Sequence, residues 1–226
     1  PYVVAAAVAG VVALEHSSQL VGRHNNDHTG RPGSADPSDD TVNAVTIVNA
    51  PGPRRDVHGR AMDVHDGVIL QWPESRLFHW YGMGYTNCTE STGLIPPTDC
   101  PGIYRPFGGC GFKTDHAINL YTSSDLVAWT FVGNVLPPDH RPDGIYFRPK
   151  LVFNNVTRQF VLWVNRLSPA GTPLAAYPNA SYVVAVSATP AGPFKVVTER
   201  AAVAHGGGGD LALLVDRTTG VGYVAY

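Results

Sequence analysis

The sequence has few charged residues. Asp, Glu, Lys and Arg make up 15% of its 226 positions and leave a formal net charge of −2. It therefore lacks the basic face with which nucleic-acid-binding domains contact phosphates, and we expect no nucleic-acid partner. Long apolar runs are missing too: the longest, residues 2–14, has thirteen residues where about twenty would span a bilayer. A neutral partner, either polyhydroxylated or apolar, fits this composition better.

Residues 2–14 have the length and composition of a signal-peptide core or of the remnant of an anchor, and the sequence begins with Pro1 rather than Met. A buried strand or helix is the alternative. Three N-glycosylation sequons follow, at Asn87, Asn155 and Asn179. Together these features predict a protein that is secreted or lies in the lumen of the secretory pathway, with no membrane contact beyond an N-terminal anchor.

Cysteine is scarce. Cys88, Cys100 and Cys110 share one segment but show no C-x-x-C spacing and no flanking pair of histidines, which argues against a zinc site. A disulfide between two of them would cross-link a long loop and leave one thiol free. The sequence does not determine which two are paired. We expect neither a metal nor a cofactor.

Two other site types have partial signals. His205-Gly206-Gly207-Gly208 is similar to the oxyanion loop of esterases, but no G-x-S-x-G nucleophile elbow accompanies it, which argues against an esterase. A metal ion shared by His58, Asp63, His65 and Asp66 is a second alternative, although their spacing matches no ligand pattern.

The sequence is rich in turn formers and apolar residues. It has 24 glycines, 19 prolines and 44% hydrophobic residues, which is typical of many short strands around a core. Residues 1–14 are assigned to the N-terminal remnant and residues 15–56 to a polar linker with one strand at Val42–Val48. Residues 57–226 are assigned to the folded domain.

Two patterns repeat along the folded domain. Apolar hairpins with polar turns are predicted at residues 66–82, 148–165 and 209–226. Between these hairpins, residues 120–129 match residues 184–194. The hairpin strands are too apolar to be solvated on both faces, so each hairpin needs neighbours on both sides.

The period of these repeats predicts a β-propeller. Trp129 and Phe194 are 65 residues apart, and Phe160 and Tyr223 are 63 apart, which suits a unit of two inner and two outer strands. Residues 62–226 contain two such blades and the inner hairpin of a third, whereas a closed propeller needs at least about four. We therefore predict an all-β chain that forms the N-terminal part of a larger protein.

Four motifs, taken in order, resemble those of a known family. They are His65-Asp66-Gly67, Tyr146-Phe147-Arg148-Pro149-Lys150, Ala188-Thr189-Pro190-Ala191-Gly192-Pro193-Phe194 and Gly209-Asp210. Residues 56–226 carry them and resemble the five-bladed β-propellers of glycoside hydrolase family 43, including its exo-galactanase branch. The resemblance implies that the chain holds about two and a half of the five blades.

The same resemblance implies an inverting glycosidase. Asp66 matches the general base of blade one, and Asp210 matches the Asp of blade three that modulates the pKa of the acid. Inverting hydrolysis needs a carboxylate that activates water and a carboxylic acid, about 6.5 to 9.5 Å away, that protonates the leaving oxygen. The acid of the family is a Glu in blade four. It would fall after Tyr226, so we expect the 226 residues alone to be inactive.

The candidates for substrate binding are His65, Phe147, Arg148 and Trp80. Phe147 stands where the exo-galactanase branch often has Glu, which leaves the polysaccharide open among the galactan, arabinan and xylan classes. Structural roles are the alternatives: Asp66 as a turn former before Gly67, Asp210 as a loop cap, and Trp80 as a core aromatic.

The predicted partner is an oligo- or polysaccharide, bound by a monomer. The alternative is a non-catalytic carbohydrate-binding propeller. The two hypotheses differ in whether the full-length gene product has a Glu on blade four.

Overall fold

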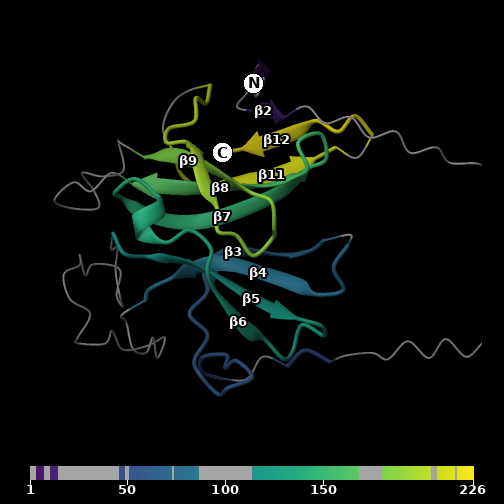
Figure 1. Ribbon diagram of the computed structural model, residues 1–226, viewed down its shortest axis with the longest axis vertical. Helices are drawn as coiled ribbons and strands as arrows, with labels where there is room; N and C mark the ends of the chain where they lie inside the picture. The colour runs from purple at the N-terminus through teal and green to yellow at the C-terminus, as the bar shows by residue number, and fades with distance from the viewer. Residues whose placement is uncertain are drawn as a thin grey trace, which may run out of the picture.

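The computed structural model describes residues 4–7, 11–14, 46–48, 51–72, 74–86, 114–167, 180–204, 208–216 and 218–226. Their strands form three four-stranded antiparallel sheets, which lie one above another in Figure 1. Within these residues the one helix is the short 3₁₀ helix η1 (Pro138–His140), and no helix of the described chain is long and apolar enough to cross a membrane. The predicted all-β class is confirmed.

The sheets have the strand order of propeller blades. The first sheet consists, in spatial order, of β3 (His65–Gln71), β4 (Phe78–Gly84), β5 (Ala117–Ser123) and β6 (Thr130–Asn134). The second consists of β7 (Ile145–Asn154), β8 (Gln159–Leu167), β9 (Ser181–Ser187) and β10 (Lys195–Thr198). The third consists of β11 (Ala212–Val215), β12 (Gly222–Ala225), β2 (Val11–Leu14) and β1 (Val4–Ala7). The three predicted hairpins are confirmed as β3–β4, β7–β8 and β11–β12.

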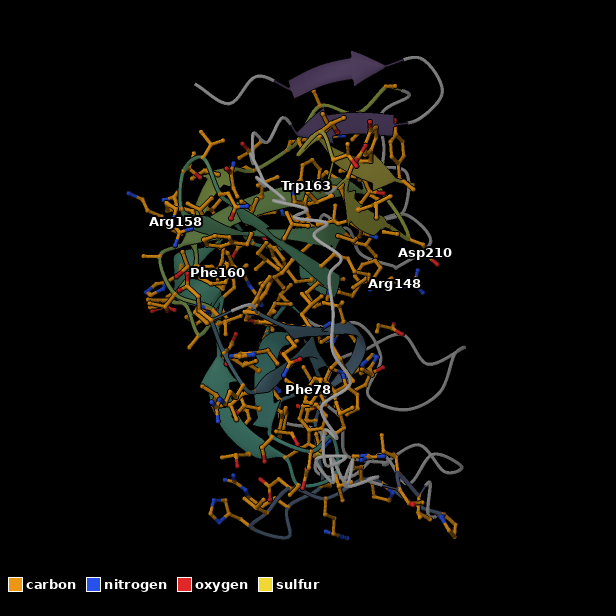
Figure 2. The ribbon with its side chains drawn as sticks, turned by 90° about the vertical axis from the view of Figure 1, so that its right-hand side faces the viewer. Phe78, Arg148, Arg158, Phe160, Trp163 and Asp210 are labelled. Carbon is orange, nitrogen blue, oxygen red and sulfur yellow. The ribbon has the colours of Figure 1, made fainter. Side chains whose placement is uncertain are left out.

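The second sheet is buried on both faces. Successive residues of β8 alternate between two clusters: Leu162 packs with Leu120 of the first sheet, and Trp163 packs with Val224 of the third. Figure 2 shows Trp163 in the layer between the second and third sheets. This two-sided burial explains why β8 is apolar at consecutive positions rather than at alternate ones.

The repeat read from the sequence also holds in three dimensions. Trp129 and Phe194 each stand directly before an outer strand, β6 and β10, and each is 1% exposed. Each is therefore a buried aromatic side chain at the equivalent position of its own sheet.

The N-terminal part differs from the sequence-based expectation. Residues 46–48 have no regular structure and are exposed, so the last part of the strand predicted at Val42–Val48 is not formed. Residues 4–7 and 11–14, which we assigned to a signal or anchor remnant, form β1 and β2. Strand β2 pairs with β12 and supplies partners for backbone groups that would otherwise form an edge. The third sheet thus has four strands where only its inner hairpin was predicted.

The end of the predicted linker contacts the domain. The side chain of Arg54 donates a hydrogen bond to the carbonyl of Leu126 (3.4 Å), and the N–H of Val57 donates to the carbonyl of Trp129 (2.9 Å). The division of the chain at residue 57 stays a prediction. The three cysteines and the sequons at Asn87 and Asn179 lie outside the described residues, whereas Asn155 is exposed in the turn between β7 and β8.

Candidate active site

The inner strands of the first and second sheets carry the same irregularity. The pairing of β3 with β4 shifts register just after His65, and the pairing of β7 with β8 shifts just after Phe147. The next residues, Asp66 and Arg148, have left-handed backbones with φ of 51° and 57°. A β-bulge of this kind turns a side chain away from the regular alternation of the strand. Asp66 and Arg148 therefore occupy equivalent positions in the two sheets.

Gly67 is required by the first bulge. A Cβ atom at this position would lie 1.7 Å from the carbonyl oxygen of Tyr81 on β4, so no larger residue fits without moving the backbone. The pair Asp66-Gly67 thus lies in a strand bulge, and the hairpin turn of this unit comes later, between β3 and β4. The alternative interpretation of Asp66 as a turn former does not match this location.

Three charged side chains meet at the inner strands: Asp66 of β3, Arg148 of β7 and Asp210, which lies just before β11. The guanidinium of Arg148 forms an ion pair with Asp210, and its Nε lies 3.7 Å from Oδ2 of Asp66. Figure 2 shows Arg148 and Asp210 side by side at one end of the stacked sheets. The side chains of Asp66, Arg148 and Asp210 are 46%, 34% and 81% exposed, so the cluster is open to solvent.

The backbone before β11 fixes the location of Asp210. The amide of Asn165, fully buried in β8, donates a hydrogen bond to the carbonyl of Gly209 (2.8 Å), and the hydroxyl of Tyr182 donates to the carbonyl of Asp210 (3.4 Å). A Cβ atom at Gly208 would lie 2.6 Å from a backbone nitrogen of β9. The close approach of this segment to the second sheet therefore explains part of the glycine run.

His65 lies between Asp66 and an aromatic ring. Its Nδ1 is 3.5 Å from Oδ2 of Asp66, and its ring stacks on Tyr85 with 4.6 Å between centroids. Burial lowers the pKa of the imidazole below its usual value, and the charge of Asp66 opposes this effect. His65 is therefore neutral at pH 7 and suited to hydrogen bonding rather than to charge pairing.

Asp63, one of the four residues considered for a shared metal ion, connects the segment before β3 to the segment after β4. Its carboxylate accepts hydrogen bonds from the N–H groups of Tyr85 (2.7 Å) and Thr86 (2.9 Å), and its carbonyl accepts one from the amide of Asn119 (2.7 Å). Burial raises the pKa of the Asp63 carboxyl, while the hydrogen bonds from the two N–H groups oppose the rise. These contacts give Asp63 a structural role.

Lys150 is the residue of this region that the sequence analysis missed. Its ammonium donates a hydrogen bond to the carbonyl of Gly67 (2.7 Å), and this contact connects β7 with the bulge of β3. The signal for it was present in the Arg-Pro-Lys motif, from which we selected Arg148 alone.

Solved structures of other proteins share this arrangement of sheets. A variant of an exo-β-1,3-galactanase from Phanerochaete chrysosporium, in complex with β-1,3-galactotriose, matches with a TM-score of 0.55 and 21% identity over 78% of this chain and 35% of that one. An exo-β-1,3-galactanase from Clostridium thermocellum matches with 0.51 and 25% identity over 79% and 34%. A β-1,3-galactosidase of glycoside hydrolase family 43 matches with 0.51 and 18% identity over 77% and 32%.

The chain has a family-43 glycoside hydrolase fold. It spans about a third of the length of these three structures. Comparison with protein-family models and with curated proteins gives no match.

The two remaining candidates in this family-43 fold are less accessible. Phe147 is 5% exposed and packs with Met83 and Leu167, while the guanidinium of Arg148 lies 5.7 Å from its ring centroid. Trp80 packs edge-to-face on Trp129, with 5.2 Å between centroids. Both contacts are those of packing residues, and a role for either ring in binding substrate stays a prediction.

The groups available for chemistry where Asp66, Arg148 and Asp210 meet are carboxylates. Asp66 is half exposed, has a cation beside it, and can accept a proton from a water molecule. Among the described residues, no group of three or more His, Cys, Asp and Glu side chains is arranged to hold a metal ion. A half-exposed carboxylate beside a guanidinium is suited to acid–base chemistry.

Proposed function

We propose that this chain is part of a glycoside hydrolase that cleaves the glycosidic bonds of a polysaccharide with inversion. Asp66 would be the general base, and Asp210 would modulate the pKa of an acid supplied by a further blade. The observation that carries the proposal is the meeting of Asp66, Arg148 and Asp210 at the inner strands of three sheets. This is where an axial site of a propeller draws one residue from each blade.

The location of the site suits an inverting reaction. Carboxylates on inner strands of different blades are separated across an axis, and this separation leaves room for the attacking water. The carboxylate of Asp66 is half exposed, so water can reach it, and Nε of Arg148 lies 3.7 Å from its Oδ2. In this arrangement His65 orients the Asp66 carboxylate, and Arg148 binds sugar hydroxyls when substrate arrives.

The substrate we propose is a plant- or algal-type polysaccharide of the galactan, arabinan or xylan class. The structural neighbours include galactanases, one of them bound to a galactose trisaccharide. In this chain an apolar, buried Phe147 precedes Arg148, so any recognition of sugar hydroxyls next to Arg148 falls to other side chains. We also propose that the protein is secreted, because the exposed Asn155 lies within a glycosylation sequon.

One observation favours a second candidate, a non-catalytic carbohydrate-binding propeller. The single cation of Arg148 lies beside both Asp66 and Asp210, so the two carboxylates are already engaged in the absence of substrate. A protein that only binds sugar needs no free base at this point.

Activity of the full-length protein distinguishes these candidates. The full open reading frame that encodes this chain should be expressed, and the protein assayed on aryl arabinosides, xylosides and galactosides, with the anomer released identified by proton NMR. We expect turnover with inversion, and a fall in kcat of about 10² to 10⁴-fold in Asp66→Asn. Asp139→Asn, at an exposed carboxylate next to His140, is the matched control and should leave kcat unchanged.

Full activity in Asp66→Asn would remove Asp66 from the mechanism. Binding of oligosaccharide without turnover of any glycoside would favour the carbohydrate-binding module. Release of the retained anomer would contradict the inverting mechanism.

A further inference from the structure

The two residues of the bulge that carries Asp66 have no paired residue on the neighbouring strand β4. The register of β3 against β4 passes from His65 directly to Val68, which leaves Asp66 and Gly67 without partners in the ladder. A left-handed backbone at a residue with a Cβ atom is unfavourable and persists only where neighbouring contacts enforce it. Gly67 follows Asp66 in the bulge, and its carbonyl accepts a hydrogen bond from Lys150 of the second sheet.

We propose that Lys150 is a positioning residue for Asp66. Its ammonium holds the carbonyl of Gly67, fixes the peptide between Gly67 and Val68, one residue beyond Asp66, and so restricts the bulge that sets the direction of the Asp66 carboxylate. The inference rests on the proposed function, in which Asp66 is the general base.

The contact joins two irregular segments of different sheets. Lys150 is the residue at which the ladder of β7 with β8 resumes after its own bulge, and it extends from there to the bulge of β3. Its side chain is partly buried, and burial lowers the pKa of the ammonium while the charge of Asp66 raises it. A hydrogen bond from a charged donor at 2.7 Å in a partly buried place is among the stronger ones that a protein makes.

A lysine at this position is not a requirement of the bulge. Lys150 follows Arg148 by two residues, and the residues at the same offset from Asp66 and Asp210 are Val68 and Ala212. The equivalent bulge of the first sheet thus accepts a β-branched apolar residue, Val68, at this offset. What distinguishes Lys150 is the direction of its long side chain, toward the one bulge that carries the proposed base.

The test compares Lys150→Met with Lys195→Met in the full-length protein. Methionine keeps the length of the side chain and removes the donor and the charge, and Lys195 is an exposed lysine on the outer strand β10. Because misplacing a catalytic group by about 1 Å can lower the rate about 10²-fold, we expect kcat to fall 30- to 100-fold in Lys150→Met. We expect KM to change less than about twofold, and both parameters to stay unchanged in Lys195→Met.

Chemical rescue separates positioning from a general structural role. In Lys150→Cys, alkylation with 2-bromoethylamine restores an ammonium at almost the original length, whereas alkylation with 1-bromopropane restores only the bulk. We expect the first reagent to recover most of kcat and the second to recover none, with the unmutated protein treated in parallel because the chain has three native cysteines. If Lys150→Met does not fold, the aminoethylated and propylated forms of Lys150→Cys are compared with each other instead.

A measurement that needs no activity completes the test. Amide hydrogen exchange at Gly67 and Val68 should be at least tenfold faster in Lys150→Met than in Lys195→Met if the contact holds the bulge. The positioning role is overturned if the wild-type protein is active and Lys150→Met keeps its kcat. It is also overturned if propyl and aminoethyl groups restore the kcat of Lys150→Cys equally. Unchanged exchange at Gly67 also overturns it. If the wild-type protein is inactive and amide exchange is faster in Lys150→Met, the proposed function is overturned instead. The hydrogen bond between Lys150 and Gly67 then remains as a structural contact.

Discussion

The bulges of β3 and β7 have the same backbone and opposite chemistry. Each breaks the ladder of an inner strand and places one residue in the left-handed region: Asp66 in the first sheet, Arg148 in the second. The following residue is Gly67 in one case and Pro149 in the other. The comparison teaches that the repeat supplies an equivalent bulge on each of these two inner strands, while the residue at that position decides whether the bulge carries a carboxylate or a guanidinium.

The two bulges should respond very differently to alanine at their second position. Gly67→Ala should lower the free energy of unfolding by about 3 kcal/mol, because the new Cβ would overlap the carbonyl oxygen of Tyr81. Pro149→Ala should change it by no more than about 1 kcal/mol, chiefly through the entropy of the unfolded chain. Urea denaturation of both variants measures the difference. Equal losses would mean that the two bulges are held by the same constraints.

The charges on the two bulges should couple only weakly in stability. The side chains of Asp66 and Arg148 are 46% and 34% exposed, and 3.7 Å separates Oδ2 of Asp66 from Nε of Arg148, so solvent screens the pair. A double-mutant cycle of Asp66→Asn and Arg148→Met should give a coupling below about 1 kcal/mol in the free energy of unfolding. A coupling above about 2 kcal/mol would show that the cluster is a structural element rather than a site open to substrate.

The smallest expected effect is on the pH dependence of the free energy of unfolding. It tests the bulge of β3, where His65 precedes Asp66. Burial depresses the pKa of folded His65 below that of the unfolded chain, so between these two values the unfolded state binds more protons. Stability is therefore full above the unfolded pKa of about 6.5 and falls as pH decreases toward the folded pKa. Unfolding by urea at pH 7 and pH 5 should show a smaller loss in His65→Phe than in the wild type.

His79 is the background for that measurement, because burial lowers its pKa too and it is present in both proteins. A loss of equal size in the wild type and in His65→Phe would mean that His65 does not contribute to the pH dependence.

Much of the fold could be predicted from local pattern. The three hairpins follow from apolar runs bounded by turn formers, and the equivalence of Trp129 and Phe194 follows from their spacing. A strand was only the alternative prediction for residues 2–14, because a thirteen-residue apolar run is compatible both with a signal core and with a strand whose partner, β12, lies some two hundred residues away. In the site, Asp66, Arg148 and Asp210 were selected from motifs, whereas Lys150 was missed because its partner is a backbone carbonyl, which has no side-chain signature.

The sequence alone determined the three hairpins, their turns and the repeat, since these depend on residues that are neighbours along the chain or in one hairpin. Only the tertiary structure decided which charges meet. Arg148 reaches Asp66 and Asp210 across separations of 82 and 62 residues, and Lys150 reaches Gly67 across 83. Such contacts depend on how the sheets stack and on the direction in which each bulge turns its side chain, and neither is encoded in the spacing of residues along one strand.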